Sequence, residues 1–370
     1  MRLWPLLCIG LAGCVSVTTP AAVTSVPTGA APTVTASPLP TIALPTASPL
    51  PTDPPPPTAP PTATPVPLAP PITPDNAADL MDMLTLTGHS GTIYGVDSTP
   101  DGRRIATAGR DQTVHLYDGE TGALLAVLER HRDFVYAVAF SPDGSLLVSG
   151  GRDRTIQIWD ALSGERIFGA RANGEVAQIA FSPDGERFVG GGYYSSIGQM
   201  WQASDGATIT LLEGHTTRLR SAAFDPMGGW LATGDSDGVV LLREPFTGTV
   251  LGSVAVDGEA LSLAFSPVDA HLAVGSSTGE ITIWDPVERM AITSWRAHSS
   301  GTLSLAFSPD GQLLASGGSD STARLWLING ERLTSLSRHG TPVRSVAFSG
   351  DGSTLVTGGD DGRAFVWRVP

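Results

Sequence analysis

The sequence contains no lysine and only two cysteines, and each shortage excludes a class of function. All 22 basic residues are arginines, and they face 36 acidic residues, so the net charge is −14 at pH 7. A general nucleic-acid-binding protein needs a basic surface, which this charge balance does not supply. Both cysteines, Cys8 and Cys14, lie at the extreme N-terminus. The rest of the chain therefore has no cysteine for a disulfide framework, a zinc site or a thiol nucleophile.

The N-terminus lacks a hydrophobic run long enough to cross a bilayer. One arginine, Arg2, precedes roughly ten apolar residues, whereas a spanning helix needs about 20. This layout is typical of a secretory signal. Residues 11–14, Leu-Ala-Gly-Cys, resemble the lipobox of bacterial lipoproteins, which implies removal of residues 1–13 and lipid attachment at Cys14. We expect an extracytoplasmic, lipid-anchored protein on the bacterial membrane. An ordinary cleaved signal and a mis-assigned start codon are the alternatives.

Residues 14–79 contain no basic residue and are dominated by proline, threonine and alanine. Nineteen of the 30 prolines fall between Pro20 and Pro74. Such a composition cannot form a packed core, and proline favours extended polyproline II. The segment is predicted to be a disordered Pro/Thr-rich tether. Recognition of its prolines by a binding domain and glycosylation of its threonines are further interpretations.

Residues 80–370 repeat at intervals of about 42 residues, which is the mark of a repeat architecture. Each unit carries a version of the turn Ser-Pro-Asp-Gly, whose proline and Asp-Gly suit a tight turn. Short apolar strands separated by turns every 8–12 residues or so predict an all-β fold. The aromatic residues that end one strand of each unit are spaced by 42, 42, 83, 42 and 41 residues, with Arg243 inside the double interval: Tyr117, Trp159, Trp201, Trp284, Trp326 and Trp367.

These units resemble the WD-repeat family over residues 80–370. The resemblance is carried by the seven turns, by Gly-His at 88–89 and 214–215, and by Trp-Asp at 159–160 and 284–285. It implies a seven-bladed β-propeller. The chain ends after the third strand of unit seven, so residues 83–87 (MLTLT) are expected to supply the missing strand and close the ring.

The stretch SGGRDRTIQIWD at 149–160, with a histidine upstream, suggests a Ser–His–Asp catalytic site. Its three polar residues occur together in five units and are missing together from units three and five. A catalytic site is not expected five times around a ring. A buried polar group without its partner costs roughly 1–3 kcal/mol, which explains why the set is kept or lost as a whole.

The family resemblance implies that the histidine lies between the aspartate and the hydroxyl, and that the hydroxyl accepts from the tryptophan indole. The predicted structural networks are His89, Thr107 and Asp111; His131, Ser149, Asp153 and Trp159; His215, Thr233 and Asp237; His298, Ser316, Asp320 and Trp326; and His339, Thr357, Asp361 and Trp367. The two other histidines, His115 and His271, have no evident clustered partners. No catalytic residue, metal or cofactor is predicted.

A binding surface is then the expected basis of function. In WD-repeat propellers, partners often use the face formed by the strand 4–1 and strand 2–3 loops. Carried over to this chain, the register places there a patch of aromatic and arginine residues, the types that dominate binding hot spots: Tyr94, Arg110, Phe134, Tyr136, Arg152, Tyr193, Tyr194, Arg218, Arg220 and Arg344.

The patch predicts a protein or peptide partner that carries carboxylates, and Arg152 is expected to be free to face it. We therefore expect a non-catalytic scaffold for protein–protein interaction, with a monomeric propeller. The alternative is a propeller enzyme, or a small-ligand or carbohydrate sensor, that uses the central channel.

Overall fold

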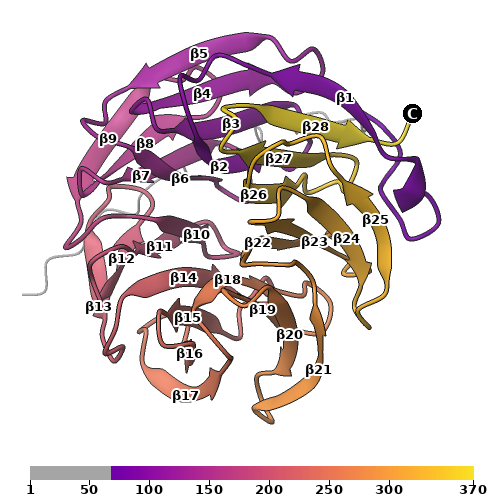
Figure 1. Ribbon diagram of the computed structural model, residues 1–370. Coiled ribbons are helices and arrows are strands. Elements are labelled where there is room, and N and C mark those ends of the chain that lie inside the picture. The colour runs from indigo at the N-terminus through magenta and orange to yellow at the C-terminus, as the bar shows by residue number, and fades with distance from the viewer. Residues whose placement is uncertain (1–67) are drawn as a thin grey trace, which may run out of the picture. The chain divides into compact units, whose positions relative to one another are not determined.

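The described part of the chain, residues 68–370 of a computed structural model, is a ring of seven four-stranded antiparallel sheets (Figure 1). This confirms the predicted seven-bladed all-β propeller. The predicted signal peptide, the lipidation site Cys14 and almost all of the predicted tether lie outside the described residues. Within residues 68–370, no helix is both long and apolar enough to cross a membrane.

Each blade places its first strand next to the central channel and its fourth strand at the rim. Blade one consists of β2 (Ile93–Ser98), β3 (Arg104–Gly109), β4 (Thr113–Asp118) and β5 (Leu124–Glu129). Blade two consists of β6 (Val135–Phe140), β7 (Leu146–Gly151), β8 (Thr155–Asp160) and β9 (Arg166–Arg171). Blade three consists of β10 (Gln178–Phe181), β11 (Arg187–Gly191), β12 (Gly198–Gln202) and β13 (Thr208–Leu212).

The remaining four blades follow the same order. Blade four consists of β14 (Leu219–Phe224), β15 (Leu231–Asp235), β16 (Val239–Arg243) and β17 (Val250–Ala255). Blade five consists of β18 (Ala260–Phe265), β19 (Leu272–Ser276), β20 (Glu280–Asp285) and β21 (Met290–Arg296). Blade six consists of β22 (Thr302–Phe307), β23 (Leu313–Gly318), β24 (Ala323–Leu327) and β25 (Arg332–Leu336). Blade seven consists of β26 (Val343–Phe348), β27 (Leu355–Gly359), β28 (Ala364–Arg368) and β1 (Met81–Leu86).

The Ser-Pro-Asp-Gly turns join the first and second strands of the blades. In blade two the Ser141 hydroxyl donates to Asp143 Oδ1 at 2.5 Å, and Gly144 adopts a φ of 72°. That backbone conformation is costly for a residue with a Cβ, which is why glycine ends the turn. We call the side of the ring with these turns the lower face. The upper face carries the loops that enter the first strands and those between the second and third strands.

The hydrophobic core lies in layers between neighbouring blades. In the layer between blades one and two, Leu116 and Leu128 pack with Leu147 and Trp159. The first three strands of blade two are mostly buried, whereas its rim strand β9 is exposed or half-buried. Stacked twisted sheets of this kind hold the inner strands in a fixed register around the channel, and that register positions the upper-face residues.

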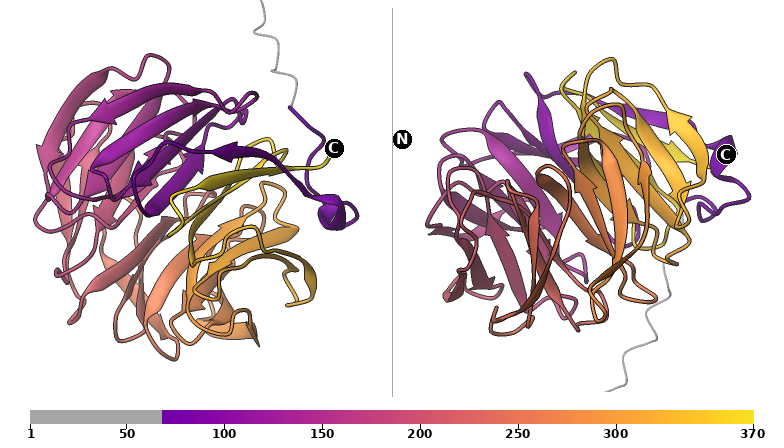
Figure 2. Two further views of the ribbon diagram at one scale, coloured as in Figure 1. Left: turned by 45° about the horizontal axis from the view of Figure 1, so that its top comes forward. Right: turned by 60° about the horizontal axis from the view of Figure 1, so that its bottom comes forward.

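Ring closure uses the strand that the sequence predicts. Strand β1 pairs antiparallel with β28, with Thr85 opposite Phe365 and Leu86 opposite Ala364. Figure 2 shows the N-terminal strand lying beside the last strand of the chain. The strand that precedes blade one therefore completes the sheet of blade seven, as expected from the missing fourth strand of unit seven.

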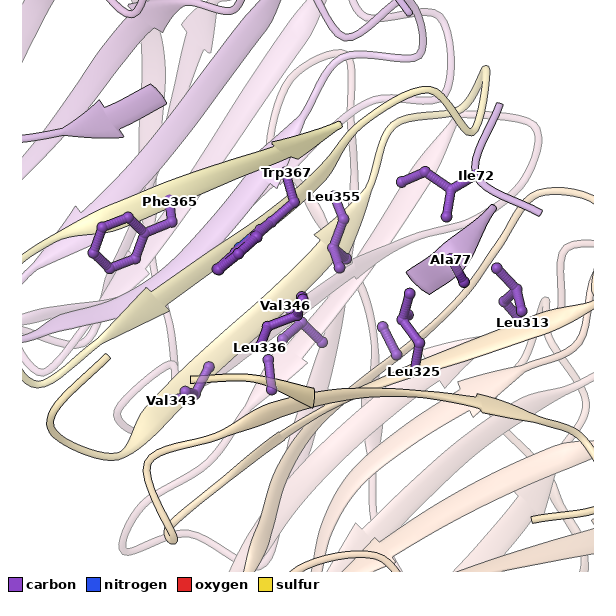
Figure 3. Close-up of a cluster of buried hydrophobic side chains, with 12 residues drawn as sticks. Ile72, Ala77, Leu313, Leu325, Leu336, Val343, Val346, Leu355, Phe365 and Trp367 are labelled. Carbon is purple, nitrogen blue, oxygen red and sulfur yellow. The ribbon is translucent and has the colours of Figure 1, made fainter. Parts of the chain in front are cut away.

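The packed part of the chain begins earlier than the predicted boundary at residue 80. Ile72 is 1 % exposed and Ala77, the first residue of the short 3-10 helix η1 (Ala77–Asp79), is fully buried. Both belong to a cluster with Leu313 and Leu325 of blade six (Figure 3). The proline- and alanine-rich composition of this segment is typical of a spacer, although its few apolar side chains pack against blade six.

Candidate functional site

The Ser–His–Asp set of blade two is a buried hydrogen-bond network. His131 Nδ1 lies 3.1 Å from both Asp153 carboxylate oxygens, and Nε2 lies 2.9 Å from Ser149 Oγ. The Trp159 indole N–H donates to the same Ser149 oxygen at 2.9 Å. The His131 side chain is fully buried. These bonds link the loop before β6 to β7 and β8, so the set acts as a clamp within the blade.

Blades six, seven and one contain the same clamp. In blade six, His298 lies 2.9 Å from Asp320 and 2.8 Å from Ser316, to which Trp326 donates at 2.8 Å. Blade seven has His339 3.0 Å from Asp361 and 2.9 Å from Thr357, to which Trp367 donates at 3.0 Å. In blade one, His89 lies 2.9 Å from Asp111 and 2.7 Å from Thr107.

Blade four departs from the prediction. His215 Nδ1 lies 2.9 Å from Asp235, and Nε2 lies 2.9 Å from Thr233, whereas the predicted partner Asp237 is exposed. Asp235 occupies a position where the other four clamped blades have glycine; at Gly109 and Gly318, an added Cβ would meet the histidine ring. The aspartate at this position therefore reaches His215 directly. The sequence interpretation took the aspartate of the turn between the second and third strands and therefore named the wrong partner, Asp237, instead of Asp235.

Arg243 replaces the indole in blade four. Its Nε donates to Thr233 at 2.9 Å, Nη1 to the Gly248 carbonyl at 2.9 Å and Nη2 to the Glu213 carbonyl at 2.8 Å. The residue is 1 % exposed, and burial lowers its pKa to about 10. An ionised arginine is therefore held inside the blade by three oxygen acceptors, none of which is a carboxylate.

Blades three and five lack the clamp, as predicted, but they retain the tryptophan. The indole Nε1 atoms of Trp201 and Trp284 are buried, and neither has a hydrogen-bond partner within residues 68–370. The loss of the set therefore leaves one unpaired donor in each of these blades. Each of these indoles lacks the hydroxyl acceptor that the indole has in blades two, six and seven, which costs roughly 1–3 kcal/mol.

His115 has a clustered partner, contrary to the prediction. Its ring stacks on His89 at 3.8 Å with an interplanar angle of 13°, and the donor atoms of both lie within 4.8 Å of those of Asp111. The two rings are nearly parallel, so their in-plane lone pairs do not converge on one ion. Both His89 nitrogens are already hydrogen-bonded. These residues do not fit a metal ion and complete the blade-one clamp instead.

Asp97 is a half-buried acid that the sequence interpretation missed. It accepts from the backbone N–H of Phe140 in blade two at 2.7 Å and from that of Ser98 at 2.9 Å. Burial raises its pKa to about 6. The other six blades have alanine at this position, so a comparison between repeats could have found it. The carboxylate joins the inner strands of blades one and two.

Several clamp residues have pKa values that differ from those of free side chains. Burial lowers the pKa values of His215, His298 and His339, although the neighbouring carboxylates oppose this effect. Burial raises the pKa values of Asp153 and Asp320, but hydrogen bonds outweigh it and hold both pKa values at about 2. At neutral pH the side chains of His215, His298 and His339 are therefore neutral, and those of Asp153 and Asp320 are ionised.

Acidification is expected to lower the melting temperature progressively from pH 7 to pH 3. Unfolded histidines take up protons near pH 6.5 and unfolded aspartates near pH 3.9, whereas the three histidines and two aspartates with lowered pKa values do so only at lower pH in the folded chain. The stability present at pH 7 is therefore lost as the pH falls. Asp97 acts in the opposite sense, because its pKa is raised, but it is a single group. Thermal melting by circular dichroism at successive pH values tests this, and a constant melting temperature from pH 7 to pH 4 would contradict it.

The upper end of the central channel gathers one residue from each blade. These seven residues share a register position in the first strand, five residues after the histidine position or its equivalent. They line a single cavity of about 90 Å³: Tyr94, Tyr136, Ala177, Arg220, Leu261, Leu303 and Arg344. The structure thus brings five of the predicted partner-binding residues to the channel mouth. They are Tyr94, Tyr136 and Tyr193 from blades one to three, Arg220 from blade four and Arg344 from blade seven.

Four aromatic residues of blades one to three lie side by side on this face. Tyr94 lies 5.1 Å from Tyr136 between ring centroids, Tyr136 lies 5.3 Å from Tyr193, and Phe134 lies 6.2 Å from Tyr94. We call Tyr94, Phe134, Tyr136 and Tyr193 the tyrosine cluster. All four are half-buried, so their rings are packed yet accessible.

Several of the predicted arginines flank the tyrosine cluster. Arg110 and Arg152 lie 5.4 Å and 5.5 Å from the Phe134 ring centroid, and Arg220 lies 4.7 Å from that of Tyr193. Guanidinium groups at such distances are attracted by the aromatic ring. The tyrosine cluster and these arginines therefore form one surface of aromatic and cationic groups.

The prediction that Arg152 is free was wrong. Its Nε lies 3.8 Å from Asp133 and 3.7 Å from Glu175, a residue of blade three. Arg344 donates twice to Asp360, at 2.8 Å and 2.7 Å. These carboxylates come from neighbouring loops, and sequence spacing alone does not place them next to the arginines.

The remaining predicted residues differ in position. Arg220 pairs with Glu259 of blade five at 3.0 Å. Arg218 is exposed, forms no ion pair within the described residues and makes no ring contact with the tyrosine cluster. Tyr194 is 76 % exposed and borders, with Tyr193 and Glu175, a second hollow of about 400 Å³. Tyr194 therefore shares a hollow with Tyr193 of the tyrosine cluster, whereas Arg218 lies apart from the cluster.

Another hollow, of about 670 Å³, lies on the lower face below blades one, two and seven. Three of its acids close the turns there: Asp101, Asp143 and Asp351 accept from the hydroxyls of Thr99, Ser141 and Ser349. These carboxylates have a structural role, so this hollow is a weaker candidate than the upper face.

Comparisons with known proteins agree with the architecture. A family model described as "IFT122 first beta-propeller" matches residues 110–368, and one described as "WD domain, G-beta repeat" matches residues 82–118. A stretch of 57 residues is 49 % identical to ribosome biogenesis protein erb1 of Botryotinia fuckeliana, covering 15 % of this chain and 8 % of that protein. A stretch of 50 residues is 52 % identical to the erb1 protein of Aspergillus niger, covering 14 % of this chain and 6 % of that protein.

Proposed function

Because the chain belongs to the WD-repeat β-propeller family, whose members generally bind proteins, we propose that it is a non-catalytic scaffold for protein–protein interaction. The observation that carries this proposal is the tyrosine cluster at the upper end of the channel. Tyrosine and arginine dominate binding hot spots, and here both occur on one surface. The histidine–aspartate sets are all bound within their blades and cannot serve as acid–base groups.

The partner is a protein or peptide that offers carboxylates. Arg110 and Arg218 pair with no carboxylate within residues 68–370, and both are exposed. Arg220 uses its Nε for Glu259 and keeps further N–H groups for another acceptor. Carboxylates on the partner would match these donors and orient its approach.

We also propose that the protein is held at the outside of a bacterial membrane by lipid on Cys14. The support is the lipobox-like residues 11–14 and the Pro/Thr-rich segment that follows them. Within the described chain, the Ile72 N–H donates to the Gly352 carbonyl at 2.9 Å, in the lower-face turn after β26. Ile72 therefore lies at the lower face, whereas Arg344, beside the channel-mouth cavity, lies near the other end of β26.

The alternative function is a propeller enzyme or a small-ligand or carbohydrate sensor that uses the channel. The channel-mouth cavity has about 90 Å³, which is small for a cofactor or a sugar. Its two arginines are already paired with Asp360 and Glu259. A protein partner that covers the whole upper face accounts for more of the observed surface.

Replacing Tyr136 by alanine is expected to abolish most partner capture without unfolding the ring. Tyr136 contacts the three other rings of the tyrosine cluster, and truncating a hot-spot residue typically weakens binding by roughly tenfold or more. The full chain and Tyr136→Ala would be compared in cross-linking pull-downs from membranes, with Leu162→Ala, an exposed lower-face residue, as the matched control. Equal capture by all three proteins would refute this binding face.

A further inference from the structure

The tyrosine cluster separates two hollows on the upper face. Tyr193 borders both the channel-mouth cavity of about 90 Å³ and the adjoining hollow of about 400 Å³. The Tyr94 and Tyr136 rings meet at 75°, so they stand edge to face instead of closing into a flat stack. Adjacent aromatic rings that border hollows are the surface on which extended proline-rich peptides dock, because each proline ring packs between two aromatic faces.

The cluster also offers unused hydrogen-bond donors. The hydroxyl groups of Tyr94, Tyr136 and Tyr193 form no hydrogen bond within residues 68–370. A polyproline II peptide makes no internal hydrogen bonds, so its backbone carbonyls are available as acceptors. Tyrosine hydroxyls above an apolar surface fit such a ligand, since they donate to carbonyls while the rings pack against prolines.

The surrounding charges favour an acid next to the prolines. Arg110 is exposed, lies against Phe134 and pairs with no carboxylate in the described part of the chain. Arg220 lies against Tyr193 and has N–H groups beyond the one that meets Glu259. Arg220 and Arg344 also border the channel-mouth cavity, but they pair with Glu259 and Asp360, so Arg110 is the cation left to meet an acid on the ligand.

We propose that the tyrosine cluster binds a proline-rich segment of a partner protein, in polyproline II conformation, with an acidic residue beside its prolines. This inference rests on the proposed scaffold function and names the chemistry of its partner. The chain's own sequence contains one stretch of this composition: Asp53 precedes four consecutive prolines, 54–57, and is the only charged residue between Cys14 and Asp75. That stretch supplies a defined probe peptide.

The test is fluorescence anisotropy of a dye-labelled peptide with the sequence of residues 51–59 (PTDPPPPTA), titrated with the full chain. Saturable binding is expected. Tyr136→Ala should weaken it roughly tenfold or more, and Tyr136→Phe, which keeps the ring, only a few-fold. The peptide with Asp53→Asn should bind about threefold more weakly and with less dependence on salt. A peptide with alanine in place of the four prolines should not bind, and Leu162→Ala should bind the original peptide normally.

Each outcome decides the proposal. A full-length variant with residues 54–57 replaced by alanine is titrated in parallel, and all variants are first checked for an unchanged melting temperature. If the peptide binds only this variant, the chain's own segment occupies the cluster and the assignment to a partner protein is overturned. No binding to either protein, or equal binding by Tyr136→Ala, also overturns it. If Tyr136-dependent capture from membranes persists while the peptide fails, the scaffold function stands and only the proline-rich ligand is wrong.

Discussion

Arg243→Ala is expected to destabilise the propeller by roughly 3–5 kcal/mol, because it empties a buried site and leaves several acceptors unpaired. The Gly248 and Glu213 carbonyls and the Thr233 hydroxyl all accept from this one guanidinium, at 2.8–2.9 Å. In a ring of this size the loss corresponds to a melting temperature roughly 10 °C lower. Differential scanning calorimetry of the full chain measures it.

Arg243→Trp is the matched control for this prediction. Blades two and six have tryptophan at the equivalent position, where the indole donates to Ser149 or Ser316. An indole at position 243 would fill the space and donate to Thr233, but it would not reach both carbonyls. We therefore expect a melting temperature between those of the natural chain and Arg243→Ala. A melting temperature for Arg243→Ala within 2 °C or so of the natural value would show that the three bonds contribute little.

Much of the fold follows from the repeat itself. The repeat period and the turn residues predict seven blades, because each repeat forms the same four-stranded sheet. The missing last strand of unit seven predicts the pairing of β1 with β28. The segment around Ile72 and Ala77 has no counterpart in the repeats, so the period says nothing about it. Its packing depends on two apolar side chains in a proline-rich stretch, a signal too weak to separate from a spacer.

The candidate site was predictable where it depends on register and unpredictable where it depends on side-chain partners. Counting from the histidine places Tyr94, Tyr136 and Arg344 around one cavity, since strand register is fixed by the sheets. The pairing of Arg152 with Glu175 joins loops of two blades, and no spacing rule within one repeat gives it.

Asp235 and Asp237 give the sharpest test of the blade-four clamp. Asp235→Ala is expected to cost about 3 kcal/mol, because it removes the partner of His215 and also leaves the backbone N–H groups of Asp237 and Val239 without the carboxylate that accepts from them. Asp237→Ala should leave the melting temperature unchanged, since its carboxylate is exposed. Thermal melting of the two variants under identical conditions compares them directly.

Asp235→Gly removes both the carboxylate and the Cβ atom, whereas Asp235→Ala keeps the Cβ. Comparing the two variants therefore distinguishes the loss of hydrogen bonds from a steric effect. Glycine is the residue of the other four clamped blades at this position, and at Gly109 and Gly318 an added Cβ would collide with the histidine. With glycine at 235, His215 gains the space to turn toward Asp237, as His89 pairs with Asp111, whereas alanine blocks that movement. We therefore expect Asp235→Gly to be more stable than Asp235→Ala, and the further replacement Asp237→Ala to remove this gain. If Asp235→Ala and Asp235→Gly lower the melting temperature equally, or if Asp237→Ala alone lowers it as much as either, the residue at position 235 does not determine which aspartate pairs with His215.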